Sequence, residues 1–101
     1  MRFLMKLSLP PEPFNHYVKD GSIGARMGKI MEDIKPEAAY FSAAGGHRGG
    51  ILVVHMDNTS QIPALAEPWF LMFNADVEFH PTMTPEDLGK AGLEALGKKW
   101  S

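Results

Sequence analysis

The 101-residue sequence contains no cysteine. It can therefore form neither a disulfide framework nor a thiolate metal site, and it offers no thiol nucleophile. It also lacks an excess of positive charge, since ten Lys and Arg against twelve Asp and Glu give a formal net charge of −2. Nucleic-acid binding is not expected, because phosphate neutralisation requires clustered cations.

Long apolar runs are absent as well. None approaches the roughly 20 residues that a membrane-spanning helix requires. Residues 1–9 are too short for the apolar part of a signal peptide and carry Lys6 in their middle. We therefore expect no membrane attachment and a cytoplasmic location. The length matches one ordinary domain, and the apolar content of 45% with 22% charged residues is typical of a globular chain. Residues 1–101 are predicted to form a single domain.

Hydrophobic periodicity and turn residues predict seven elements. The expected strands are residues 2–9, 37–42, 51–56 and 75–80, and the expected helices are residues 14–34, 60–73 and 85–98. The first helix has apolar stripes in two phases, so we expect a break near residues 20–22, with Ser22 as a new cap. Pro68 is expected to kink the second helix or restart it at Trp69.

The glycine-rich residues 45–50 connect the second and third predicted strands. A phosphate-binding loop is one interpretation, with backbone amides and Arg48 holding an anion. The segment lacks the spacing of a P-loop, however, and a strand rather than a helix follows it. We therefore expect a hairpin turn in which glycines provide positive φ, with His47 and Arg48 at the mouth of any cavity.

The order of elements is β-α-β-β-α-β with an additional C-terminal helix. With right-handed crossovers, this order predicts an α+β fold, the ferredoxin-like split βαβ with a four-stranded antiparallel sheet. Helices can cover only one face of such a sheet, and the other face is still half apolar. We therefore predict that two copies pair through their sheets.

Six runs of the sequence resemble a family of uncharacterised bacterial proteins of about this size. They are residues 7–15, 34–41, 48–54, 66–70, 74–79 and 83–88. More broadly, the chain is similar to the dimeric α+β barrel superfamily, which includes muconolactone isomerase-like and antibiotic-biosynthesis monooxygenase-like proteins. This resemblance implies a homodimer in the form of a dimeric α+β barrel, in which two sheets face each other across a shared cavity, and it supplies no catalytic residues. Some relatives bear an automatic label of pantothenate synthetase, but that enzyme resembles Rossmann proteins with a His-x-Gly-His signature, which this chain lacks.

Alternation along the strands predicts a polar cluster on the sheet face away from the helices. Its members are Lys6, Ser8, His55, Asp76, Glu78 and His80. Carboxylates and imidazoles that share a low-dielectric cavity perturb each other's pKa values, which is how general acid and base pairs arise. The predicted catalytic residues are Glu78 or His80 as base and His55 as a second titrating group. Lys6, Tyr40 and Arg48 are the predicted substrate-binding residues. No cofactor is expected.

Two alternatives stay open at this point. The cluster can consist of ion pairs at the interface of a structural or regulatory dimer without activity, with Glu78 neutralised by Lys6. A divalent metal can use Asp76, Glu78 and His80 together with His55, but no helical His-x-x-x-His motif supports such a site, and none is predicted. All of these interpretations depend on the register of the fourth strand, because a slip of one residue turns Glu78 and His80 towards the helices.

Overall fold

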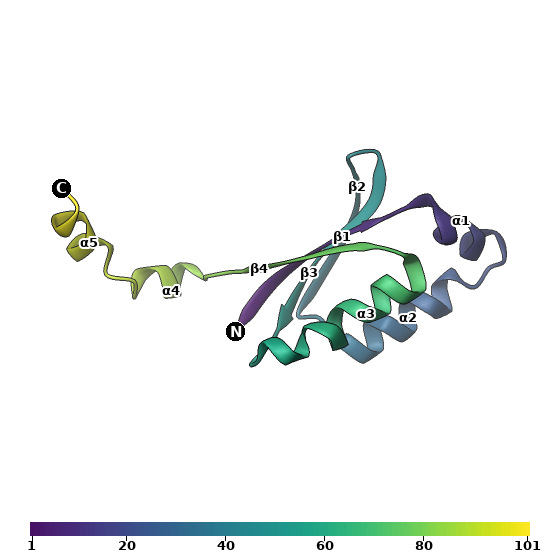
Figure 1. Cartoon of the computed structure of the whole chain (residues 1–101), viewed down its shortest axis with the longest axis horizontal. Coiled ribbons are helices and arrows are strands. Elements are labelled where there is room, and N and C mark those ends of the chain that lie inside the picture. The colour runs from purple at the N-terminus through teal and green to yellow at the C-terminus, as the bar shows by residue number, and fades with distance from the viewer.

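The computed structural model describes residues 1–101 and is an α+β structure (Figure 1). Its elements are β1 (Arg2–Leu9), α1 (Pro11–Lys19), α2 (Ile23–Ile34), β2 (Ala38–Ala44), β3 (His47–His55), the 3₁₀-helix η1 (Thr59–Gln61), α3 (Ile62–Phe73), β4 (Asp76–Pro81), α4 (Pro85–Gly89) and α5 (Leu93–Lys99). The strand order is β2-β3-β1-β4, and all neighbouring strands are antiparallel. This is the ferredoxin-like arrangement, so the predicted fold class is confirmed.

Helices α1, α2 and α3 cover one face of the sheet, and the core lies between them and the strands (Figure 1). Trp69 and Phe73 on α3 are fully buried, and their rings stack with centroids 5.9 Å apart. Opposite them, alternate residues of the two central strands point into the core, with Met5 and Leu52 fully buried. No helix of the structure is long and apolar enough to cross a membrane.

The predicted break in the first helical segment is confirmed. α1 ends at Lys19, Gly21 adopts a φ of +81°, and α2 begins at Ile23. Ser22 occupies the N-cap position, but its side chain forms no capping hydrogen bond. Its hydroxyl instead accepts a hydrogen bond of 2.9 Å from Nε of Arg26.

The hairpin turn is shorter than predicted. It consists of Gly45 and Gly46 alone, with φ values of +64° and +79°, as a two-residue type I′ turn requires. β3 therefore begins at His47, which pairs with Ala44. The prediction that residues 47–50 belong to the turn is wrong, because the first glycine pair reverses the chain and the second pair continues the ladder.

The alternative prediction that the helix restarts at Trp69 is wrong. α3 runs as one helix from Ile62 to Phe73 with Pro68 inside it. A proline in a helix interior removes one backbone hydrogen bond, and here Ala66 and Trp69 are buried on either side of it. Tertiary burial thus holds the helix together across the proline. Asn74 ends the helix in the left-handed conformation, with φ of 55°.

The C-terminal residues leave the rest of the molecule after Thr82 (Figure 1). Thr82 still donates hydrogen bonds to the carbonyl of Arg2, and residues 83–101, called the C-terminal arm, then project away from the sheet (Figure 1). The single predicted helix is in fact α4 and α5, separated at Gly92 with φ of +73°. The exposed large apolar side chains of the arm are Met83, Leu88, Leu93, Leu96 and Trp100.

Candidate functional site

The sheet face without helices, called the open face, carries side chains in rows across the four strands. Each row is given in the strand order β2, β3, β1, β4, starting at the hairpin end. The first row is Ser42, Gly49, Ser8 and Asp76, and the second is Tyr40, Ile51, Lys6 and Glu78. The third row is Ala38, Val53, Leu4 and His80. The register of β4 therefore places Glu78 and His80 away from the helices, as the sequence predicted. Polar groups stand at the hairpin end of this face, and an apolar patch lies beside them.

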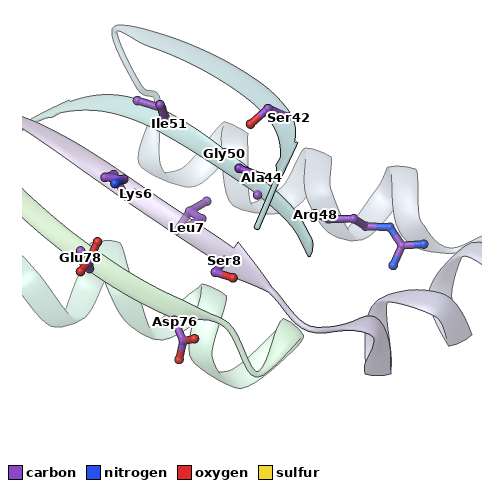
Figure 2. A pocket seen from close by; sticks show the side chains of 11 residues that line it. Lys6, Leu7, Ser8, Ser42, Ala44, Arg48, Gly50, Ile51, Asp76 and Glu78 are labelled. Carbon is purple, nitrogen blue, oxygen red and sulfur yellow. The ribbon is translucent and has the colours of Figure 1, made fainter. Parts of the chain in front are cut away.

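A hollow of about 470 Å³ lies over most of the first two rows, and neither Tyr40 nor His80 is among its lining residues. Figure 2 shows Lys6, Ser8, Asp76 and Glu78 on the adjacent strands β1 and β4, with Ser42 on the hairpin across from them. Gly49 forms part of the lining and contributes no side chain. A Cβ atom at this position would lie 2.7 Å from the carbonyl oxygen of Leu7, so a larger residue requires the two strands to move apart.

Lys6 is the only cation whose side chain stands in these two rows. It faces Glu78 directly across the β1–β4 pair, but it forms no ion pair with this or any other carboxylate. The nearest partner of Glu78 is instead His80, with 3.6 Å between Oε2 and Nε2. The ion pair between Lys6 and Glu78, which the structural alternative expects, is therefore not formed in the protomer. The Lys6 ammonium is free to bind an anionic ligand.

Tyr40 shares its row with Lys6 and Glu78, and Ile51 stands between the tyrosine and the lysine. The tyrosine side chain is 71% exposed on the open face. The structure thus brings four of the predicted site residues, Lys6, Tyr40, Glu78 and His80, onto two neighbouring rows.

His55 does not join this group. It pairs with Arg2 at the far end of the sheet, and its Nε2 lies 3.3 Å from Oε1 of Glu37. Arg2 donates two hydrogen bonds to the same carboxylate, at 2.7 and 2.9 Å. These bonds from Arg2, and then the contact with His55, hold the pKa of Glu37 below its ordinary value. The predicted face was right, but the antiparallel register of β3 places His55 four residues beyond Ile51.

Arg48 lies on the other side of the sheet. It follows the same alternation as Gly50 and Leu52, and its guanidinium is 4.4 Å from the centroid of the Phe14 ring. In Figure 2 its side chain points away from Lys6 and Glu78. Arg48 borders the same hollow as Lys6, but its guanidinium is directed to the Phe14 ring because Arg48 is part of a strand and not of a loop with free orientation. Of the two cations predicted to hold an anionic substrate, Lys6 is therefore the one that stands on the open face.

Sequence reasoning did not identify Ser42 and Gly49 as part of the site. A glycine within a strand often marks a place where another backbone or a ligand approaches closely, and this signal was available at Gly49. Asp76, Glu78 and His80 stand two residues apart along one strand, which separates successive side chains by about 6.6 Å. No group of three or more acidic or histidine side chains gathers closely enough to hold a metal ion.

Residues 1–96 match the model of a family described as a domain of unknown function, DUF3303. The chain belongs to the DUF3303 family. No curated protein matches its sequence. Among solved structures, this DUF3303 chain resembles 5-chloro-2-hydroxyhydroquinone dehydrochlorinase (TftG) from Burkholderia phenoliruptrix, in complex with 2,5-dihydroxybenzoquinone.

The two structures align with a TM-score of 0.58 at 15% sequence identity. The match covers 86% of the DUF3303 chain and 99% of TftG. At this identity the likeness concerns the fold, which in TftG is the dimeric α+β barrel. The match to DUF3303 confirms that the chain belongs to a family of unknown function, and the likeness to TftG confirms the type of fold.

Proposed function

We propose that this DUF3303 protein is a homodimer that binds a small organic anion in a cavity between two paired sheets. The observation that carries the proposal is the hollow of about 470 Å³ on the open face, which holds the unpaired Lys6 beside Glu78. Its volume is within the range of roughly 300–1,000 Å³ that small-molecule sites occupy. A single protomer leaves this hollow open to solvent on one side, and a second sheet would close it.

Pairing through the open face is supported by the apolar side chains beside the hollow. Tyr40 on the edge strand β2 is exposed. Ile51 is also exposed, and Leu4 and Val53 are only half-buried, although these three stand on the two central strands. Burying such a surface against a second copy is the common solution for a sheet that helices cover on one face only. The exposed apolar side chains of the C-terminal arm add to the surface that a partner can cover.

The chemistry that suits these residues is cofactor-independent proton transfer. Lys6 would hold the anionic group of the ligand, Tyr40 would donate a hydrogen bond, and Glu78 would take a proton from carbon, with His80 beside it as the second titrating group. The complex of TftG with 2,5-dihydroxybenzoquinone supports a small oxygen-bearing ring as the kind of ligand that this fold accommodates. His55 has no part in this proposal because it lies at the far end of the sheet, beside Arg2. Arg48 has none because its guanidinium lies over the Phe14 ring.

The experiment combines light scattering with NMR titration of the full chain, using 2,5-dihydroxybenzoquinone as the probe. We expect the mass of a dimer and shift changes centred on Lys6, Ser8 and Glu78. Lys6→Gln should weaken binding roughly tenfold or more, since it removes a hydrogen bond to a charged group. Lys29→Gln, which removes an exposed lysine on α2, should bind the probe as wild type does.

A monomeric wild-type protein would contradict the proposal. A dimer that does not bind the probe at the open face would favour the structural or regulatory alternative. The proton-transfer step has its own measurement, the exchange of the probe's ring hydrogens with D₂O. A positioned general base contributes about 10²–10⁴-fold, so Glu78→Gln should lose most of any acceleration. Cytoplasmic location, a single domain and independence of cofactors remain predictions from the sequence.

A further inference from the structure

A second cavity, of about 410 Å³, opens on the helix-covered side of the sheet. It is a groove between the hairpin end of β2 and β3 and the helices α1 and α2. Its lining residues are Leu9, Phe14, Met27, Phe41, Ser42, Arg48 and Gly49. This set, called the hairpin groove, meets the hollow of the open face only at the hairpin strands, and no residue of β4 borders it.

The walls of the hairpin groove are apolar and partly exposed. Phe41 is 51% exposed, and its ring lies against the backbone of Gly50. A Cβ atom at Gly50 would come within 3.0 Å of that ring, so the glycine permits its position. Phe14 forms the opposite wall and packs on the core through Phe73, with ring centroids 5.5 Å apart.

Arg48 is the only charged residue that lines the groove. It forms no ion pair, and its guanidinium lies over the Phe14 ring, 4.4 Å from the centroid. The ring holds the cation at the edge of the apolar walls without neutralising it. A guanidinium presents a planar fork of donors that matches a carboxylate with two parallel hydrogen bonds. The groove therefore combines an anion-binding group at one end with hydrocarbon-binding walls.

We propose that the hairpin groove binds a medium-chain fatty acid or a similar apolar carboxylate. Its carboxylate is held by Arg48, and its hydrocarbon chain lies along Phe14, Met27 and Phe41. A purely apolar ligand would leave the arginine unpaired, and a small inorganic anion would leave the walls wet. The groove shares Ser42, Arg48 and Gly49 with the hollow of the proposed function, but Lys6 lines only the hollow, and the Arg48 guanidinium lies over the Phe14 ring on the helix side of the sheet.

The test is titration of the full-length protein with decanoate, followed by NMR of the methionine methyl groups and the backbone amides. Shift changes should centre on Met27 and Phe41, and Arg48→Gln should weaken decanoate binding roughly tenfold or more. Decanol, which has the same chain without the charge, should bind wild type as weakly as decanoate binds the variant. Circular dichroism verifies that the variant is folded, and Arg48→Lys should retain part of the affinity.

Arg26 provides a matched control, because its guanidinium also lies over an aromatic ring, 3.8 Å from the centroid of Tyr17, but outside the groove. Arg26→Gln should bind decanoate as wild type does, and so should Lys6→Gln, which alters only the open face. Equal affinity of wild type and Arg48→Gln, or shift changes centred on Lys6 and Glu78, would overturn the proposal. Failure of this titration leaves the binding of the quinone probe unaffected, so the two proposals fail independently.

Discussion

The two faces of one sheet behave differently although the same four strands build both. On the helix-covered face, Met5, Leu52 and Val54 meet Trp69 and Phe73, and all five side chains are essentially inaccessible. On the open face, the alternate positions of the same strands carry lysine, carboxylates and serines beside Ile51 and Tyr40. A strand has a period of two, so each residue serves one face only.

This difference indicates where stability and function reside. The side chains of the covered face are buried against helices of the same protomer, so they determine whether the chain folds. The open face has apolar residues that nothing in the protomer covers and charged residues that lack partners. Its side chains are therefore expected to determine assembly and ligand binding, with little effect on the folding of a protomer.

The largest expected effect comes from breaking the covered face at Trp69. Trp69→Ala should lower the free energy of unfolding by about 3–5 kcal/mol, because it leaves a large cavity in the core. Chemical denaturation followed by circular dichroism measures this change. Trp69→Phe should cost clearly less, because it keeps most of the ring and removes an indole N–H that is buried without a hydrogen-bond partner. If both variants lost the same free energy of unfolding, packing of the aromatic ring at this position would not be what stabilises the core.

The second prediction concerns the open face at Ile51, which is 39% exposed in the protomer and stands between Tyr40 and Lys6. Ile51→Glu should weaken dimerisation by roughly 2 kcal/mol or more, the size of a central interface contact, because it places a charge against the partner sheet. Analytical ultracentrifugation should show dissociation at concentrations where wild type is paired. The far-ultraviolet circular dichroism should stay unchanged. A paired variant with wild-type affinity would mean that the open face is not the interface.

The sequence predicts this contrast between the faces but not the position of each residue along the strands. Alternation in β1 and β4 is enough to place Lys6, Glu78 and His80 on one side. It does not specify that β3 pairs His55 with Arg2, because that register depends on contacts between residues more than fifty positions apart.

The hairpin shows the same limit. Two glycine pairs, Gly45-Gly46 and Gly49-Gly50, both suit a turn by composition. The first pair forms the turn, because the second is needed where β3 lies close to β1 at Leu7 and beneath the Phe41 ring. This tertiary requirement makes Arg48 a strand residue and directs its side chain to the helix side. Pro68 is a related case, since burial of the neighbouring Ala66 and Trp69 holds a helix that local propensity would interrupt.

The smallest predicted effect lies at the far end of the open face, in the cluster of Arg2, Glu37 and His55. Because hydrogen bonds from Arg2 and then His55 lower the folded-state pKa of Glu37, its ionised form stabilises the fold. This contribution is fully present above the ordinary pKa of 4.5 and is lost as the pH falls through the lower folded-state pKa. The unfolding free energy of wild type relative to Glu37→Gln should therefore be higher at neutral pH, and the difference should shrink below about pH 4.5.

Both side chains of the Arg2 and Glu37 pair are about two-fifths exposed, at 38% and 41%, so the difference should be small and should also decrease with added salt. Urea denaturation at several pH values measures it. Glu67→Gln on α3 is the matched control, since Glu67 is exposed and its side chain forms no ion pair. If the difference between wild type and Glu37→Gln grew towards acid pH, the carboxylate would be destabilising in the fold. The contacts of Glu37 with Arg2 and His55 would then not stabilise the protomer.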